Sequence, residues 1–200
     1  MGFAHGGVFL VMQLVSGRTL EGELDDRGPF TPARACRIAR DVLAGLSAIH
    51  AAGLVHRDLK ASNVLLGRGD RAVLLDLGAA LHQRRKSLTA PGTVLGTPEC
   101  MAPEQLAQRP LDGRVDLFQL GLIVIHMATG VRVDCAVDPT RLAIPAALRE
   151  VVTRALAPVD ERFASAAEMD TALAAALSAC TLDPVEPLVS RKKTKRWPPR

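Results

Sequence analysis

Apolar residues recur along this chain with the period of an α-helix over several stretches, and the clearest of these lies between residues 31 and 53. Its apolar side chains, spaced three and four residues apart, are Ala35, Ile38, Val42, Leu46 and Ile49. Thr31 followed by Pro32 is typical of an N-cap and first helical position, and Gly53 is typical of a helix end. The pattern therefore predicts one amphipathic helix over about 32–52.

Four further stretches carry helical signals. Val115 to Thr129, "VDLFQLGLIVIHMAT", is apolar nearly all round and is followed by Gly130, which predicts a buried central helix. Amphipathic patterns predict two more helices, over Pro145 to Ala157 and Ser165 to Cys180. A short helix is expected over 20–26.

Strand signals concentrate in the first 76 residues. The apolar, β-branched run from Gly6 to Val15 predicts a strand. Shorter strands are expected over 54–55, 64–66 and 72–75, with "GRGD" at 67–70 as the hairpin turn between the last two. Residues 78–97 have no period, and so long a loop is usually functional or disordered. The predicted fold class is α+β and mostly helical, with short β-hairpins and a buried central helix.

Composition narrows the class of protein. Two hundred residues with 48% apolar content suit one domain with a real core. We expect no transmembrane segment, because no run of 18 uncharged apolar residues occurs. Four scattered cysteines and five scattered histidines make no metal signature, so reduced thiols in a cytoplasmic protein are expected.

The net charge of +4 comes from the C-terminus. The last ten residues, "RKKTKRWPPR", carry six positive charges and no negative one, and without them the net charge is −2. We therefore divide the chain into a domain over 1–180 and a disordered, Pro-containing basic tail over 181–200. Such a tail suits nucleic acid, anionic lipid, an acidic partner or solvent alone, and it predicts no specific nucleic-acid binding.

The stretch "LVHRDLKASNVLL" places several polar side chains between two apolar runs, and "AVLLDLGAA" adds Asp76 after the next strand. Antiparallel pairing of the two strands would bring Asn63 and Asp76 together, with Asp58 nearby. An amide oxygen and a carboxylate suit Mg²⁺ with phosphate ligands. The remaining carboxylate could accept a proton, and Lys60 could neutralise phosphate charge.

These residues resemble the C-terminal lobe of a protein kinase, of the eukaryotic-like serine/threonine type found in bacteria. "HRDLKASN" matches the catalytic-loop pattern H-R-D-L-x-x-x-N, and "DLG" resembles D-F-G. The resemblance implies ATP and Mg²⁺ as cofactors and a protein substrate with Ser or Thr. It implies that Asp58 orients the substrate hydroxyl and Lys60 contacts the γ-phosphate. It implies metal ligation by Asn63 and Asp76.

The resemblance extends over most of the chain, from about Phe9 to Leu177. "GTPECMAPEQ" resembles the end of an activation loop, with Thr97 facing substrate. The other positions implied are adenine contacts at Gln13, Val15 and Leu65, a gatekeeper at Met12, and structural or regulatory residues at His56, Arg57, Gly78, Asp116, and the pair Glu104 and Arg162.

The sequence departs from the family's pattern in three places. Leu77 replaces the Phe of D-F-G, which is a conservative change in an apolar slot. No G-x-G-x-x-G loop, V-A-I-K lysine or helix-C glutamate occurs before the strand at Phe9, so the N-lobe is expected to be missing from this chain. Residues 131–145 leave little room for the family's helix G.

Three interpretations remain open. The chain is the C-lobe of an ATP-dependent serine/threonine kinase, or a catalytically inactive module that binds a kinase, a substrate or a regulator, or a fragment without function. Aminoglycoside-type phosphotransferases share the catalytic core but lack the "GTPE…APE" segment. Ser87, Thr89 and Thr93 are candidate phosphorylation sites, because a phosphate there could pair with Arg57.

Overall fold

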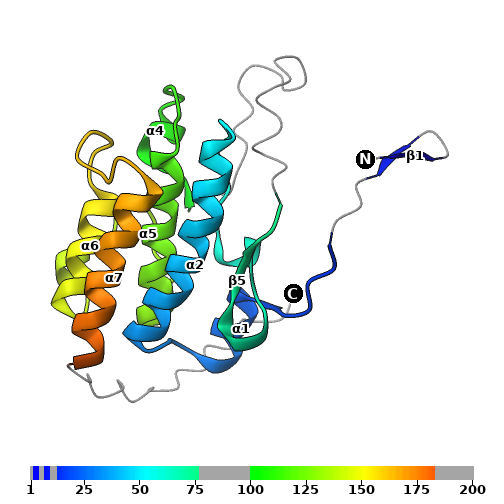
Figure 1. Cartoon of the computed structure of the whole chain (residues 1–200). Coiled ribbons are helices and arrows are strands. Elements are labelled where there is room, and N and C mark those ends of the chain that lie inside the picture. Colours follow the sequence, from blue (N-terminus) through cyan, green and yellow to red (C-terminus); the bar gives the residue numbers. More distant parts are fainter. Residues whose placement is uncertain (1, 5–6, 10–12, 77–99, 183–200) are drawn as a thin grey trace, which may run out of the picture.

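The computed structural model describes residues 2–4, 7–9, 13–76 and 100–182. Its body is a group of four long helices packed side by side (Figure 1). The long helices are α2 (Pro32–Ala51), α5 (Arg114–Thr129), α6 (Ala146–Leu156) and α7 (Ala166–Leu182). Two shorter helices are α1 (Leu20–Arg27) and α4 (Pro103–Leu106). A small sheet lies beside α2.

Helix α2 forms as its sequence predicts. Thr31 caps it by accepting a hydrogen bond from the backbone N–H of Arg34 at 3.3 Å. The predicted apolar face is buried, apart from a partly buried Ile49 near the C-terminal end. Gly53 follows the helix with φ +70°, a left-handed conformation that glycine adopts without strain.

Helix α5 lies at the centre of the fold. Every residue from 115 to 127 is buried, which confirms the predicted buried helix. Gly130 ends it in the left-handed conformation (φ 72°), with its N–H donating to the His126 carbonyl at 2.8 Å. A Cβ at Gly121 would lie 2.9 Å from that of Ala155 in α6, so this glycine lets the two helices approach closely.

The described strands form two small sheets. Strands β3 (Arg18–Thr19), β4 (Val64–Leu66) and β5 (Ala72–Leu74) form an antiparallel sheet in that order. The predicted hairpin is confirmed, with a 3₁₀ turn over Arg68–Asp70. The predicted strand over 54–55 is wrong. Instead, the N–H of Leu54 donates to the Ile49 carbonyl at 3.1 Å, as part of the end of α2.

The N-terminal strand is shorter than its sequence predicts. Strand β2 (Gly7–Phe9) pairs with β1 (Gly2–Ala4), and Gly2 opposite Phe9 is the last pair in the register. Residues 13–16 have no regular structure, and the Leu14 side chain is 92% exposed. An apolar run needs a pairing neighbour to be a strand, and the described residues provide none for 13–15.

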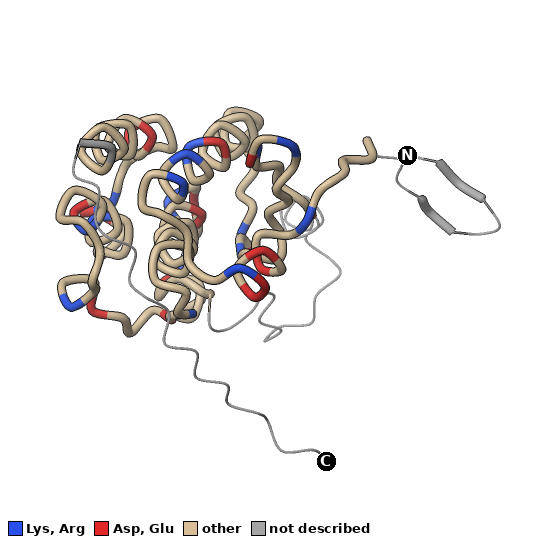
Figure 2. The backbone as a smooth tube through the Cα atoms, turned by 90° about the horizontal axis from the view of Figure 1, so that it is seen from below, with Lys and Arg blue, Asp and Glu red and all other residues tan. Residues whose placement is uncertain are grey.

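Between α5 and α6 the chain is compact. The only helix described between residues 131 and 145 is the 3₁₀ turn Pro139–Arg141, in agreement with the short connection predicted there. Acidic and basic residues lie interspersed over the body (Figure 2). Within the described ranges, no helix has the length and apolar character needed to cross a membrane.

Candidate active site

A loop over residues 54–63 joins α2 to the sheet, and a carboxylate from α5 holds its backbone. Asp116 is fully buried and accepts hydrogen bonds from the backbone N–H groups of His56 (2.9 Å) and Arg57 (2.8 Å). Its Oδ2 also lies 2.7 Å from Nε2 of His50. Three donors at one carboxylate compensate for the loss of water around a buried charge. The loop is thereby fixed to the most buried helix.

Arg57 has a left-handed backbone, with φ 68°, a conformation that costs a non-glycine residue roughly 1–3 kcal/mol. Two buried amides hold it there. The Arg57 carbonyl accepts from Nε2 of Gln105 at 2.9 Å and from Nε2 of Gln119 at 3.0 Å. The Gln119 side chain also accepts from the Leu59 N–H at 3.0 Å. The loop conformation therefore depends on α4 and α5 together.

The sequence interpretation missed three members of this network, namely His50, Gln105 and Gln119. Gln119 had a usable signal, because it is a polar side chain in a helix that is otherwise buried and apolar. Gly113 was also missed as a packing requirement. A Cβ at this position would lie 2.7 Å from the His50 ring, so the ring can reach Asp116 only beside a glycine.

Polar side chains predicted to be catalytic meet at the end of the loop. Nζ of Lys60 lies 2.9 Å from Oδ2 of Asp58. Nδ2 of Asn63 donates to the backbone carbonyl of Asp58 at 2.8 Å and lies 3.4 Å from Oδ2 of the Asp58 side chain. With its nitrogen engaged in this way, the Asn63 side chain presents its oxygen as an acceptor or metal ligand.

The β4–β5 hairpin brings the second carboxylate to the same place. The register pairs Val64 with Leu74, and the Leu75 N–H donates to the Asn63 carbonyl at 2.8 Å. Asp76 follows directly, exposed and with φ 55°. Nε2 of the buried His56 lies 3.1 Å from the Leu75 carbonyl. This contact ties the start of the catalytic loop to the strand that carries Asp76.

The donor set at this end of the hairpin fits a hard divalent cation only in part. Asn63 and Asp76 offer one amide and one carboxylate, the kind of oxygen ligands that Mg²⁺ takes. Among the residues that the structure describes, no group of three or more His, Cys, Asp or Glu could enclose a metal ion. The set suits Mg²⁺ that takes its remaining ligands from phosphate oxygens and water.

A buried ion pair lies on the other side of α5. Arg162 and Glu104 are 4% and 7% exposed. Their contact is bidentate, with Nη2 of Arg162 at 2.9 Å from Oε2 of Glu104 and Nη1 beside Oε1. Nε of Arg162 donates to the Ala157 carbonyl at 2.7 Å, and the guanidinium lies over the Phe118 ring. The predicted pairing of these two residues is present in the structure.

The Arg57 side chain is partly buried. Among the described residues, its buried Nε has no hydrogen-bond partner. Burial lowers the pKa of this guanidinium, while the charge of Asp116 acts in the opposite direction. A buried cation with an unused donor is an anion-binding group by its chemistry.

The remaining predicted residues are less well placed. Leu65 is partly buried in β4, while Gln13 is exposed and Val15 partly buried in a segment without regular structure. The other predicted positions lie outside the described residues: Met12, Leu77, Gly78, Ser87, Thr89, Thr93 and Thr97.

Comparison with known proteins identifies one family along most of the chain. The model of the protein kinase domain family matches residues 4–197. Serine/threonine-protein kinase PknH of Mycobacterium bovis is 34% identical over 215 residues, which cover 98% of this chain and 36% of that protein. PknL of Mycobacterium tuberculosis is 40% identical over 122 residues, or 61% of this chain and 31% of PknL.

PknD of Mycobacterium tuberculosis is 34% identical over 196 residues, covering 88% of this chain and 30% of PknD. The chain thus spans about a third of the length of these relatives. The family model matches nearly the whole of this chain. The chain belongs to the protein kinase family, in its bacterial, eukaryotic-like serine/threonine branch.

Proposed function

We propose that this chain carries the phosphoryl-transfer site of a serine/threonine protein kinase, which moves the γ-phosphate of ATP to a Ser or Thr hydroxyl of a protein. The observation that carries the proposal is the meeting of Asp58, Lys60 and Asn63 with the end of the strand leading to Asp76. Phosphoryl transfer depends mostly on positioning and on neutralising charge, and this arrangement of side chains supports a role in both.

In this proposal Asp58 accepts or orients the hydroxyl proton of the substrate as the substrate oxygen bonds to the γ-phosphorus. The bond from that phosphorus to the bridging oxygen breaks, and ADP leaves. Lys60, with Nζ 2.9 Å from Asp58, supplies positive charge beside the transferred group. Asn63 and Asp76 would hold Mg²⁺, which when bound neutralises charge on the β- and γ-phosphate oxygens.

Binding of ATP would also use the segment before α1. We propose that the Gln13 carbonyl and the Val15 N–H are the hydrogen-bonding groups for adenine, and that Leu65 forms the floor beneath it. Leu65 suits this role because its side chain remains partly exposed in β4. Autonomous catalysis by this chain is a separate question, because the sequence contains neither the glycine-rich loop nor the lysine that position phosphates in the family.

Replacing Asp76 by Asn should abolish the thermal stabilisation that ATP gives in the presence of Mg²⁺. The change removes the carboxylate charge that would hold the cation, while keeping the size of the side chain. The measurement is the shift in Tm on adding Mg²⁺ and ATP, compared with ATP and EDTA. Asp134→Asn is a matched control, because Asp134 is an exposed carboxylate in the loop after α5, and its shift should equal that of the wild type.

An unchanged Mg²⁺-dependent shift in the Asp76→Asn protein would remove Asp76 from the metal site. If the wild-type chain showed no such shift, this chain would not form the nucleotide site by itself, and the alternative of a catalytically inactive binding module would then be favoured. Phosphorylation of a generic Ser/Thr protein substrate by the wild type, lost in Asp58→Asn, would establish the activity.

We further propose that Arg57 receives a phosphate placed on Ser87, Thr89 or Thr93. The buried Nε of Arg57, which has no hydrogen-bond partner among the described residues, supports this role. A phosphate there would form charge-assisted hydrogen bonds with the guanidinium. Mass spectrometry of the protein from its native cells should find at least one of the three sites occupied. The phosphorylated chain should have a higher Tm than the unphosphorylated chain, and Arg57→Met should remove this difference. A lack of phosphate at all three sites would refute the proposal.

A further inference from the structure

A groove runs along the outward face of α2, on a part of the fold that the catalytic loop does not use. We call it the α2 groove. One section has a volume of about 660 Å³ and lies between α7 and the turn of the β4–β5 hairpin. A second section of about 420 Å³ lies between α2 and β5, and shares Asp41 and Ala44 with the first. The floor is made of small residues of α2, including Ala44, Gly45 and Ser47.

Most charges around the groove neutralise one another. Arg34 forms a bidentate ion pair with Asp70, at 2.7 and 2.8 Å. Arg40 pairs with Asp170, at 2.7 and 3.2 Å. The remaining carboxylate is that of Asp41, whose Oδ2 accepts the N–H of Ala72 at 3.0 Å. The carboxylates of Asp70 and Asp170 are thus each engaged at both oxygens by one arginine.

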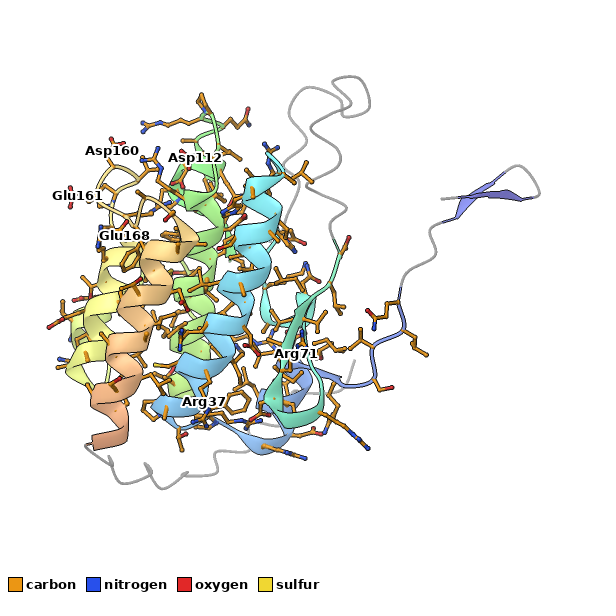
Figure 3. The ribbon with its side chains drawn as sticks, viewed as in Figure 1. Arg37, Arg71, Asp112, Asp160, Glu161 and Glu168 are labelled. Atoms are coloured by element: carbon orange, nitrogen blue, oxygen red, sulfur yellow. The ribbon has the colours of Figure 1, made fainter. Side chains whose placement is uncertain are left out.

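Two arginines that line the groove, Arg37 and Arg71, have no carboxylate within ion-pair distance in the described part of the chain. Figure 3 shows Arg37 on α2 and Arg71 at the start of β5. The labelled carboxylates of Asp112, Asp160, Glu161 and Glu168 lie at the other end of the molecule in the same view (Figure 3). Once the ion pairs are counted, the groove keeps the positive charges of Arg37 and Arg71 beside the single carboxylate of Asp41.

Strand β5 adds backbone groups that do not bond to β4 along one wall. It is the edge strand of the described three-stranded sheet. The register follows from hydrogen bonds on either side of the paired Val73 and Leu65. The Arg71 carbonyl accepts from the Gly67 N–H, and the Leu75 N–H donates to the Asn63 carbonyl. The N–H and C=O groups of Ala72 and Leu74 therefore point away from β4. The Ala72 N–H reaches Asp41 of α2, so this edge faces the groove.

We propose that the α2 groove binds an extended, acidic segment of a partner protein. Carboxylates of the segment pair with Arg37 and Arg71, its small or aliphatic side chains lie over Ala44 and Gly45, and its backbone uses the open edge of β5. Edge groups give affinity to an extended peptide, and flanking charges give it direction and selectivity. The site is separate from the phosphoryl-transfer residues, so binding here does not require the chain to be catalytically active.

A photo-crosslinking peptide tests this on the full chain. The probe is a ten-residue peptide that alternates Glu with Val and carries one benzoylphenylalanine, used at physiological salt. Crosslinks mapped by mass spectrometry are expected within 37–49 of α2 and 70–74 of the hairpin. Its affinity, measured by fluorescence anisotropy with a labelled copy, should fall about tenfold or more in Arg37→Glu/Arg71→Glu. The same peptide with Gln in place of Glu should bind the wild-type chain at least as weakly as the acidic peptide binds Arg37→Glu/Arg71→Glu.

Two matched variants separate the groove from general attraction between charges. Arg109→Glu/Arg141→Glu reverses two exposed arginines elsewhere and should retain the wild-type crosslinks. Ala44→Phe fills the floor from an exposed helix position and should abolish the crosslinks to α2 without lowering Tm. Three outcomes would overturn the proposal. The crosslinks could be confined to residues 191–200, or α2 could be crosslinked equally in Ala44→Phe and the wild type. Binding could also fall equally in both charge-reversal variants.

The same arginines could attract an anionic membrane surface, and the experiment tells the two apart. The wild-type chain could sediment with phosphatidylserine vesicles, lose this binding in Arg37→Glu/Arg71→Glu, and show no crosslinking by the acidic peptide. That result would assign the arginines to lipid and overturn the peptide site. Failure of peptide binding would leave the Mg²⁺-dependent shift with ATP unaffected, so the two proposals fail separately.

Discussion

Replacing Arg162 by Met is expected to lower the free energy of unfolding by about 3–5 kcal/mol. The guanidinium is the bidentate partner of Glu104, and both side chains are buried. Without it the Glu104 carboxylate is left in the interior with neither a counter-charge nor its two hydrogen bonds. Met fills much of the same volume, so the loss reports the missing pair rather than a cavity.

Urea unfolding followed by circular dichroism measures this loss. Glu104→Gln should also destabilise, because it leaves the Arg162 cation unpaired. Combining Arg162→Met with Glu104→Leu should recover part of the stability, since neither charge is then buried. Arg154→Met is the matched control, because its pair with Glu168 is exposed (46% and 39%) and should cost no more than about 1 kcal/mol. An equal effect in control and test variants would show that the buried pair does not support the fold.

Replacing Asp116 by Ala should have an effect of similar size, about 3–5 kcal/mol, and a wider consequence. It removes the acceptor of the buried His56 and Arg57 N–H groups and the partner of His50. The left-handed backbone at Arg57 then loses one of its restraints. We expect the loop that carries Asp58 and Asn63 to open locally, with loss of the Tm shift given by Mg²⁺ and ATP.

Hydrogen exchange gives this prediction a local readout. The amides of His56 and Arg57 should exchange much faster in Asp116→Ala, at a denaturant concentration where most molecules are folded. Asp112→Ala is the control, because Asp112 is an exposed carboxylate that bonds to Arg114 at the start of the same helix. If the two amides exchanged at the same rate in Asp116→Ala and Asp112→Ala, Asp116 would not be the group that holds the loop.

The helices could be predicted from sequence because each has a local cause. Thr31 caps α2 and Gly130 ends α5 by hydrogen bonds within four residues, and the apolar period needs only one buried face. The strands were harder, since a strand exists only where another chain segment pairs with it. Two segments have strand propensity without forming the predicted strand. In the described structure, the apolar run that ends at Val15 is paired only up to Phe9, and Leu54-Val55 is not paired at all.

The same division holds at the site. The motif at Asp58 to Asn63 and the pairing of Glu104 with Arg162 could be inferred from the family's pattern. The amides of Gln105 and Gln119 could not, because their target is the carbonyl of Arg57, which is 48 and 62 residues away. No local signal links them, and only the folded chain shows that one strained residue is held from two helices.

The packing of α7 on α2 has a consequence for the synthesis of the protein. Arg40 and Asp170 pair across 130 residues, and the two helices share the main core. At about 5–20 residues per second, a ribosome needs roughly 7–26 s between making the two partners. During that interval the apolar face of α2 lacks the helix that covers it. The nascent chain therefore exposes part of the apolar face of α2 to solvent until α7 has emerged.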